Sequence, residues 1–435
     1  MSPSPNVNRA KAGPKPASQR SSSEAVAHTK TRSSSEAVAR TKTRSSSEAV
    51  AQKDSNTPFK EISLLLQGGG ALGSYQGGVY QALMEHKVEP TWICGISIGA
   101  INSAIIAGNA PEHRVEKLRE FWELVTTGGT WNNVWLDLPG AEMVRGFANQ
   151  MAAGDVLLRG VPGFFTPQTP PAPFQPKGSA GATSWYDNHA LRGTLERLVD
   201  FDRINHGAIR LSVGAVNVRT GNFAYFDTRD VKIRVDHVMA SGALPPAFPA
   251  VAIDGELYWD GGMVSNTPLD WVLSSREDVD SLILQVDLWS ARGEAPGDLS
   301  EVGTRMKDIQ YSSRTRAATD EFKRRQKLRA ALYKLMKQLP QELVGTPEAK
   351  LLTRETDAAS YNIVQLIYRS ASYESQSKDF EFSRQTMEEH WQAGYRDASI
   401  TLSHPDVVAL PPEPPQVRVF DCLRPPGEHG GRIET

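Results

Sequence analysis

The sequence predicts an α/β fold with a mostly parallel central sheet that helices cover on both faces. The prediction depends on the order in which strand-like and helix-like apolar patterns follow one another along the chain. Residues 62–66 form a short apolar run typical of a buried parallel strand, and residues 75–86 follow with the apolar spacing of a helix. Residues 92–94 and 100–107 repeat this strand and helix pattern. Such an alternation indicates parallel strands joined by helical crossovers.

Length and composition exclude several classes of protein. A chain of 435 residues is long enough for two or three units. Its net charge of -2 argues against nucleic acid as a partner. Two cysteines, Cys94 and Cys422, provide neither a disulfide framework nor a cysteine-rich metal site. No apolar run reaches the ~18 to 20 residues that span a bilayer, and the amino terminus lacks the apolar segment of a secretory signal. We therefore expect a soluble cytoplasmic protein without metal or other cofactor, which can still contact a membrane surface.

Residues 1–57 form a separate segment rich in Ser, Ala, Lys and Arg. The sequence SSSEAVA recurs in it with a 12-residue period, starting at Ser21, Ser33 and Ser45. Ten basic and four acidic residues give this segment a net charge of +6. Because it has almost no large apolar residues, we predict a disordered basic tail that arose by tandem duplication. Its charge leaves open a weak attraction to an anionic surface or a targeting role.

Residues 60–290 are predicted to form the main domain. Residues 126–184 interrupt its regular pattern, and we predict an irregular insertion or lid there because prolines are frequent. The apolar and aromatic side chains of this insertion would suit an apolar ligand, or would pack the insertion onto the domain. They are Trp131, Trp135, Phe147, Phe164, Phe165 and Phe174. The other predicted elements are helices at 113–125, 188–199 and 235–241, and strands at 211–217, 223–226, 251–253, 257–259 and 281–286.

Residues 298–405 are predicted to form a mainly helical carboxy-terminal extension, followed by a loose Pro-rich tail at 406–435. Between Arg305 and Lys337 there are eleven basic and three acidic residues. An apolar stripe recurs there at helical spacing and consists of Leu328, Leu332, Leu335 and Leu339. Such a helix can lie on an anionic lipid surface, but we favour docking of the stripe onto its own domain. A strand at 361–368 and a helix at 382–400 complete the extension.

Gly95-Ile96-Ser97-Ile98-Gly99 joins the second predicted strand to its helix, as a nucleophile elbow does. Gly68 to Gly73 fits the pattern G-x-G-x-x-G after the first strand. A dinucleotide site would need an acidic residue at the end of the second strand, where the chain instead has the elbow. We therefore predict that Gly68, Gly69 and Gly70 form a loop whose amides stabilise an oxyanion.

A serine nucleophile also needs a base, and no histidine has a recognisable triad setting. A surface or packing role accounts for His86, His113, His189, His206 and His237. Asp260 is the stronger candidate, because it ends a predicted strand and precedes Gly261 and Gly262, which keep its surroundings free of side chains.

These three motifs resemble those of the patatin-like phospholipases over residues 62–287. The oxyanion loop ends at Gly73, the elbow is bounded by Gly95 and Gly99, and Asp260-Gly261-Gly262 corresponds to the Asp-Gly-Ala/Gly motif. Residues 240–249 also resemble the segment that precedes this motif, and the carboxy-terminal region resembles the extension of a bacterial subgroup. The resemblance implies a three-layer α/β/α fold and a dyad of Ser97 and Asp260 without histidine. Leu72 departs from the pattern, since many relatives have Arg or Lys there.

The leading hypothesis is a serine acyl hydrolase of the phospholipase A or lysophospholipase kind, whose substrate partner is a lipid ester. Asp260 would accept the Ser97 proton, and an acyl-enzyme would form. Two alternatives remain open at this point. One is transfer of the acyl group to an alcohol or lysolipid, and the other is a non-catalytic protein that binds lipid or polyester surfaces through the cationic helix.

Overall fold

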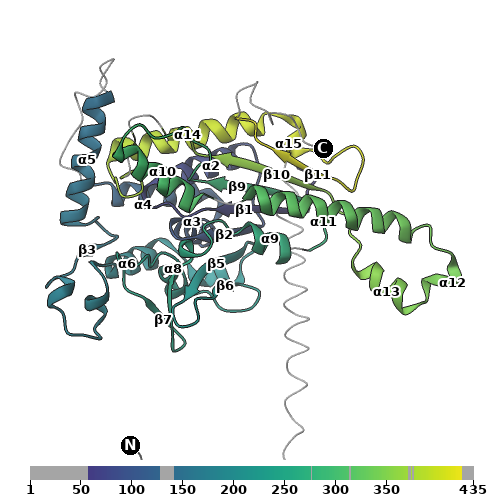
Figure 1. Cartoon of the computed structure of the whole chain (residues 1–435), viewed down its shortest axis with the longest axis horizontal. Coiled ribbons are helices and arrows are strands. Elements are labelled where there is room, and N and C mark those ends of the chain that lie inside the picture. The colour runs from purple at the N-terminus through teal and green to yellow at the C-terminus, as the bar shows by residue number, and fades with distance from the viewer. Residues whose placement is uncertain are drawn as a thin grey trace, which may run out of the picture. The chain divides into compact units, whose positions relative to one another are not determined.

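A nine-stranded sheet forms the centre of the computed structural model, which describes residues 57–127, 142–275, 277–312, 315–370, 374 and 377–423 (Figure 1). The strand order is β11-β10-β9-β1-β2-β5-β8-β7, and β6 also pairs with β5. The strands are β1 (Glu61–Leu66), β2 (Trp92–Ile96), β5 (Arg210–Asn217), β6 (Phe223–Asp227), β7 (Val251–Ile253), β8 (Glu256–Asp260), β9 (Ser281–Asp287), β10 (Tyr361–Ile367) and β11 (Val417–Phe420). All pairs from β11 to β5 are parallel, and β6, β7 and β8 pair in antiparallel fashion. The predicted α/β class with a mostly parallel sheet is confirmed.

Helices pack on both faces of this sheet. The α-helices of the described residues are α2 (Ser74–Glu85), α3 (Ile98–Ala107), α4 (Arg114–Val125), α5 (Glu142–Arg159), α6 (His189–Leu198), α7 (Phe201–His206), α8 (Val235–Ser241), α9 (Leu269–Ser275), α10 (Leu299–Tyr311), α11 (Thr315–Met336), α12 (Gln341–Val344), α13 (Pro347–Arg354), α14 (Arg384–Leu402) and α15 (Pro405–Val408). Of these, α12 and α13 lie beyond the edge of the sheet (Figure 1). A two-stranded sheet, β3 (Thr166–Pro167) with β4 (Tyr186–Asp187), lies outside the main sheet. None of the described helices is both long and apolar enough to cross a membrane.

The central strand β1 shows why the sheet needs two helical layers. Successive side chains of a strand point to opposite faces. Leu64 and Leu66 belong to a large core that includes side chains of α2, α3, α4 and α14. Leu65 belongs to a second core with side chains of α9 and α11. All six residues of β1 are buried, including the polar Glu61 and Ser63, so both faces of the strand are covered.

The carboxy-terminal extension shares this sheet with the main domain. Strand β10 pairs in parallel with β9 along its whole length. Helix α14 packs along α2, where small residues allow the two backbones to approach closely: an ideal Cβ on Gly394 would lie 2.0 Å from the carbonyl oxygen of Tyr75. The indole of Trp391 is fully buried at this contact and donates to Gln81 Oε1 over 2.8 Å.

Two expectations about irregular segments need correction. The insertion at 126–184 is not irregular throughout, because it contains the 18-residue helix α5. The prolines of the insertion cluster at 162–176, and the stretch that forms α5 has none. The Pro-rich end is likewise not loose throughout, since α15 begins at Pro405 and β11 pairs with β10. Strand β11 alternates buried and partly buried residues, and its Phe420 packs into the core.

The leucine stripe of the basic helix does not dock fully onto the domain. The buried side chains of α11 are instead Thr319, Phe322 and Gln326, while Leu328 is 71% and Leu335 is 58% exposed. Figure 1 shows α11 running past the edge of the sheet and continuing into α12 and α13. The predicted tail, as far as residue 56, and residues 128–141 and 424–435 lie outside the described residues, as do Trp131 and Trp135.

Candidate active site

Ser97 occupies a sharp turn between β2 and α3. Its backbone has φ +55° and ψ -125°, a conformation that residues other than glycine rarely adopt. Gly95 and Gly99 permit this turn: an ideal Cβ on Gly95 would lie 2.3 Å from the carbonyl oxygen of Gly99, and one on Gly99 would lie 2.1 Å from that of Leu66. The turn therefore has the geometry that the predicted elbow requires, and Ser97 is half-buried, with its side chain lining a cavity.

Ser241, at the end of α8, supports the strained turn. The Ser97 amide donates to Ser241 Oγ over 2.9 Å, and the Ser241 hydroxyl donates to the Gly214 carbonyl over 2.6 Å. Ser241 is fully buried. The sequence analysis included this serine in the segment 240–249 but gave it no role. The residues around Ser241 in the sequence do not indicate that it contacts Ser97.

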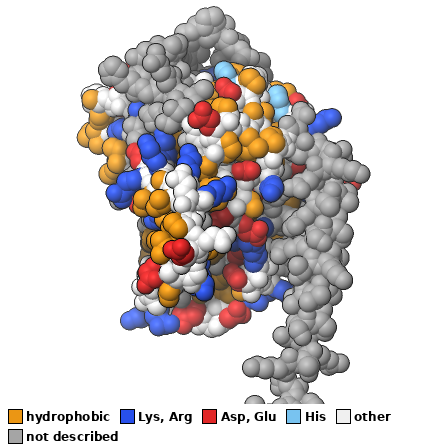
Figure 2. Space-filling model, turned by 90° about the vertical axis from the view of Figure 1, so that its right-hand side faces the viewer, with side chains coloured by type: hydrophobic (Ala, Val, Ile, Leu, Met, Phe, Trp, Pro, Cys, Tyr) orange, Lys and Arg blue, Asp and Glu red, His pale blue; other side chains and the backbone are white. Residues whose placement is uncertain are grey.

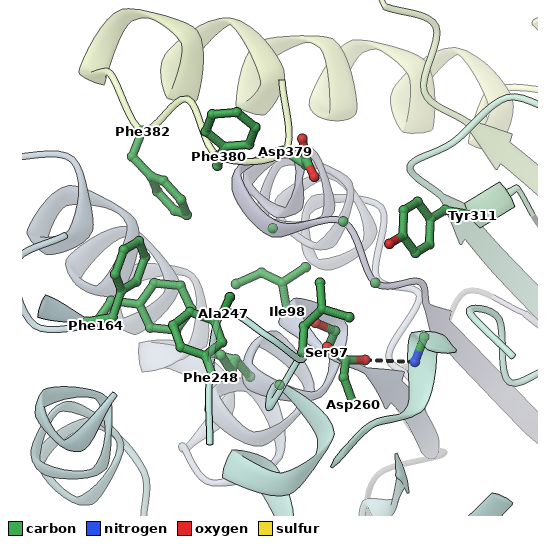
Figure 3. Close-up of a pocket in the computed structure, with 18 of the residues that line it drawn as sticks. Ser97, Ile98, Phe164, Ala247, Phe248, Asp260, Tyr311, Asp379, Phe380 and Phe382 are labelled. Carbon is green, nitrogen blue, oxygen red and sulfur yellow. Dashed lines mark hydrogen bonds between the residues drawn. The ribbon is translucent and has the colours of Figure 1, made fainter. Parts of the chain in front are cut away.

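Asp260 ends β8 and lies beside Ser97 (Figure 3). Its Oδ1 accepts the Gly262 amide over 2.7 Å. The aspartate is 2% exposed. Burial raises its pKa to about 7, although the Ser97 side chain and the Gly262 amide act in the opposite direction. Gly261 keeps the turn close to β5, since an ideal Cβ there would lie 2.8 Å from the Gly214 carbonyl oxygen.

The glycine loop after β1 lies against Ser97. An ideal Cβ on Gly68 would be 3.0 Å from the Cβ of Ser97. The Gly68 carbonyl accepts from Asn266 Nδ2 and from Trp289 Nε1, each over 2.9 Å, so the loop is held from two sides. The Gly68 amide donates to the Asn266 carbonyl over 3.3 Å, so it is not free to serve as the predicted oxyanion donor. Among the described residues, no acceptor is found for the amides of Gly69 and Gly70. These donors are therefore available to a ligand.

The carboxy-terminal extension holds the other end of this loop. Gly70 has φ +56°, and an ideal Cβ on it would lie 2.0 Å from the carbonyl oxygen of Asp379. The same carbonyl accepts the Ala71 amide over 2.8 Å. Gly73, which closes the motif, packs against Ile98 of α3. Leu72 is fully buried in the core, so this position presents no polar group to the site.

An apolar cavity of about 240 Å³ opens at Ser97 and Asp260. By this measure a single water needs about 10–15 Å³, so the cavity is large enough for an organic ligand. Four phenylalanines from distant segments form part of its wall, with ring centroids 5.3 to 6.5 Å apart. They are Phe164, Phe165, Phe248 and Phe382.

Sequence reasoning missed the contribution of the carboxy-terminal extension to this cavity. Tyr311, Asp379, Phe380 and Phe382 all line it. Figure 3 shows Phe164 and Phe248 on one side of Ser97 and Tyr311 on the other. Of the insertion's aromatic residues, Phe164 and Phe165 line the cavity, whereas Phe174 is 78% exposed. The side chain of Phe147 lies outside the described residues.

No described histidine lines the cavity. His237 is buried against Phe226, and burial lowers its pKa to about 4. Among the described residues there is also no group of three or more His, Cys, Asp or Glu side chains that could hold a metal ion. Within the described part of the chain, the cavity therefore offers Ser97 as a nucleophile and no histidine as its base.

The mostly parallel α/β sheet thus carries a strained serine elbow beside a buried aspartate. A family model described as patatin-like phospholipase matches residues 64–273, and a second one, described as patatin phospholipase, matches residues 309–414. The chain belongs to the patatin-like phospholipase family. The second match covers the segment that supplies Tyr311 and Asp379.

The individual proteins that resemble this chain have low sequence identity to it or match only a short part of it. A triacylglycerol lipase, SDP1L, from Arabidopsis thaliana is 35% identical over 75 residues, which are 17% of this chain and 8% of that protein. The structure of VipD from Legionella pneumophila has a TM-score of 0.34 and 16% identity, covering 79% of this chain and 66% of that one. Human GIVD cytosolic phospholipase A2 has a TM-score of 0.29 and 12% identity, covering 60% and 46%. This chain thus spans only a small part of the curated lipase that it matches.

Proposed function

We propose that this protein is a serine acyl hydrolase that cleaves carboxylic esters of lipids. The observation that carries the proposal is the strained Ser97, which lies beside the buried Asp260 in an apolar cavity. An apolar wall suits an acyl chain, and the two side chains supply a nucleophile and a base without a histidine.

In the proposed mechanism Asp260 accepts the hydroxyl proton as Ser97 Oγ attacks the ester carbonyl. The amides of Gly69 and Gly70 then donate to the developing oxyanion, and the amino terminus of α3 adds favourable dipole charge at Ser97. Collapse of the tetrahedral intermediate breaks the bond to the alcohol, which leaves with the proton held by Asp260. A water molecule, deprotonated by Asp260, releases the free acid and restores Ser97.

The test compares wild type with Ser97→Ala and Asp260→Asn on emulsified acylglycerols and phospholipids. We expect Ser97→Ala to remove hydrolysis and Asp260→Asn to reduce it by about 10²- to 10⁴-fold, the usual contribution of a general base. Ser274→Ala is the control, because its hydroxyl bonds only to helix carbonyls at an exposed position. A fluorophosphonate probe should label wild type and not Ser97→Ala. Full activity of Ser97→Ala would refute the proposal.

Contact with an anionic lipid surface through α11 to α13 is the second part of the proposal. Several side chains along this arm are 42 to 71% exposed: Leu328, Leu335, Leu343, Val344, Leu351 and Leu352. The basic residues of α11 stand beside them, and the face in Figure 2 shows hydrophobic and basic side chains close together. A surface of this kind is suited to the boundary between lipid headgroups and acyl chains.

Vesicle sedimentation tests this contact. Wild type should sediment with vesicles of mixed anionic and zwitterionic lipid, and less with purely zwitterionic vesicles. Leu328→Ser combined with Leu335→Ser should weaken the binding. Leu257→Ser is a matched control, since Leu257 is 48% exposed on β8 outside the arm. Unchanged binding of the double variant would exclude this arm as the contact.

A further inference from the structure

The cavity wall contains two carboxylates and no cation among the described residues. Asp260 lies at Ser97, and Asp379 lies farther toward the carboxy-terminal side of the wall. Tyr311 stands near both: burial raises the pKa of its hydroxyl, and the carboxylates of Asp379 and Asp260 raise it further. A phosphate brought into this space would meet the carboxylate of Asp260 and that of Asp379, whose charge Lys307 partly offsets without itself lining the cavity.

The polar donors of the wall are largely engaged within the protein. Asn266 Nδ2 donates to the carbonyls of Gly68 and Tyr311 over 2.9 and 3.0 Å. Trp289 Nε1 also donates to Gly68, and the Tyr186 hydroxyl donates to the Leu157 carbonyl over 3.0 Å. The amides of Gly69 and Gly70 are assigned to the oxyanion in the proposed function. A phosphate that enters the cavity loses hydrogen bonds to water, and the wall has few free donors to replace them.

The lysines nearest to this wall already have carboxylate partners. Lys307 Nζ lies 2.7 and 3.0 Å from the two oxygens of Asp379, and Lys378 Nζ lies 2.7 Å from Asp308. The Lys307 and Asp379 side chains are 26% and 22% exposed, so their charges are only partly screened by water. This pair supplies no net positive charge to attract an anion.

The two ends of the cavity differ in character. Phe164 and Phe248 lie on one side of Ser97, where an acyl chain would be buried among aromatic rings. Tyr311 lies on the other side, with Asp379 above the loop, so the alcohol portion of an ester would face these two residues. A hydroxyl-bearing alcohol can accept from or donate to them, whereas a phosphate cannot donate to Asp379 once ionised.

We infer that this site takes uncharged acyl esters, such as acylglycerols, in preference to esters that carry a phosphate on the alcohol, and that the Asp379 carboxylate enforces the preference. The inference rests on the proposed function. Asp379 acts here as a specificity residue at the alcohol end of the cavity. Its main-chain carbonyl has the separate role of holding the Ala71 amide.

The experiment compares two substrates that share one acyl chain and one scissile ester: 1-octanoyl-glycerol and 1-octanoyl-glycerol 3-phosphate, both below their micelle concentrations. Dissolved monomers remove any effect of a charged lipid surface. We expect kcat/KM of wild type to be at least tenfold higher for the uncharged ester. Equal values, or a higher value for the phosphate, overturn the inference while leaving ester hydrolysis intact. Hydrolysis of neither ester, together with no fluorophosphonate labelling of Ser97, overturns the proposed function as well.

Two variants, one that removes a negative charge and one that removes a positive charge, then test the role of Asp379. Asp379→Asn keeps the shape and the main-chain carbonyl, and it should reduce the preference by about fivefold to tenfold, as expected for one charge acting through a partly screened site. Lys307→Met leaves Asp379 without this lysine and should increase the preference. Glu256→Gln breaks an ion pair with Arg219 at the exposed end of a hairpin and should leave the ratio unchanged. If Asp379→Asn does not fold, the Lys307→Met variant tests the role of Asp379 by whether its preference for the uncharged ester increases. The same ratio of the two kcat/KM values in all folded variants overturns the role of Asp379.

Discussion

The backbone of Gly78 on α2 contacts Trp391 on α14 so closely that an ideal Cβ on the glycine would lie 1.9 Å from the tryptophan carbonyl oxygen. This contact joins the segment that follows the glycine loop to the carboxy-terminal extension. The extension in turn supplies Asp379, whose carbonyl holds Ala71. Packing of α14 and the position of the candidate oxyanion loop are therefore mechanically connected.

Gly78→Ala should separate α2 from α14 and lower both stability and ester hydrolysis. Overpacking of this kind costs about 1–3 kcal/mol, and the intrinsic gain of alanine in a helix is about 1 kcal/mol. Urea unfolding and kcat measure the two effects. Gly193→Ala is the matched control, because an ideal Cβ on this glycine of α6 would meet no atom within 4 Å, and it should be neutral or stabilising. Equal behaviour of the two variants would show that the close contact is unimportant.

Ser241→Ala should weaken the support of the elbow. The substitution leaves the Ser97 amide without its acceptor and the Gly214 carbonyl without its donor. Leaving such buried groups unpaired costs about 1–3 kcal/mol. We expect a lower free energy of unfolding and slower fluorophosphonate labelling of Ser97, with a change in kcat larger than that in KM. Labelling at the wild-type rate would contradict a positioning role.

The pH dependence of kcat/KM should follow the ionisation of Asp260. Only the carboxylate can accept the Ser97 proton, and burial raises its pKa to about 7. The rate should therefore rise with pH to a plateau above about pH 7 and be roughly 100-fold lower at pH 5. Circular dichroism at pH 5 checks that the fold persists. A rate that is constant between pH 5 and pH 9 would exclude Asp260 as the base.

The same ionisation predicts a pH-dependent effect of Asp260→Asn on stability. The pKa of Asp260 is about 7 in the folded state, against about 3.9 for an unfolded aspartate. Between these values the folded state binds the additional proton, so the stability of wild type falls as pH rises from about 4 to 7. The asparagine variant lacks this loss. Its free energy of unfolding relative to wild type should increase between pH 4.5 and pH 8, by a few kcal/mol at most.

Denaturant titrations at these two pH values measure the difference. Asp254→Asn provides the comparison, since that aspartate is exposed at the hairpin turn. An Asp260→Asn effect that is the same at both pH values would show that the carboxylate ionises normally in the folded protein.

Local patterns in the sequence were sufficient to predict the sheet strands from β1 to β10, the glycine loop and the elbow, whereas β11 and the short pair β3 and β4 were missed. Each is encoded by neighbouring residues: apolar runs for buried strands, and Gly95 and Gly99 where backbones meet. The sequence also indicated Asp260 as the candidate base, because a strand end followed by two glycines is a local feature. Helix α5 was missed, since the prolines that follow it obscured its pattern.

Only the tertiary structure decided the surroundings of these groups. Tyr311 and Asp379 reach the cavity because β10 and α14 extend the fold of the main domain. Ser241 meets Ser97 because α8 packs against the elbow, and the raised pKa of Asp260 comes from burial by many segments. The exposure of Leu328 likewise depends on where α11 leaves the sheet. Spacing along the chain determines local backbone geometry, whereas burial and charge environment depend on residues that are distant in sequence and meet only in the folded protein.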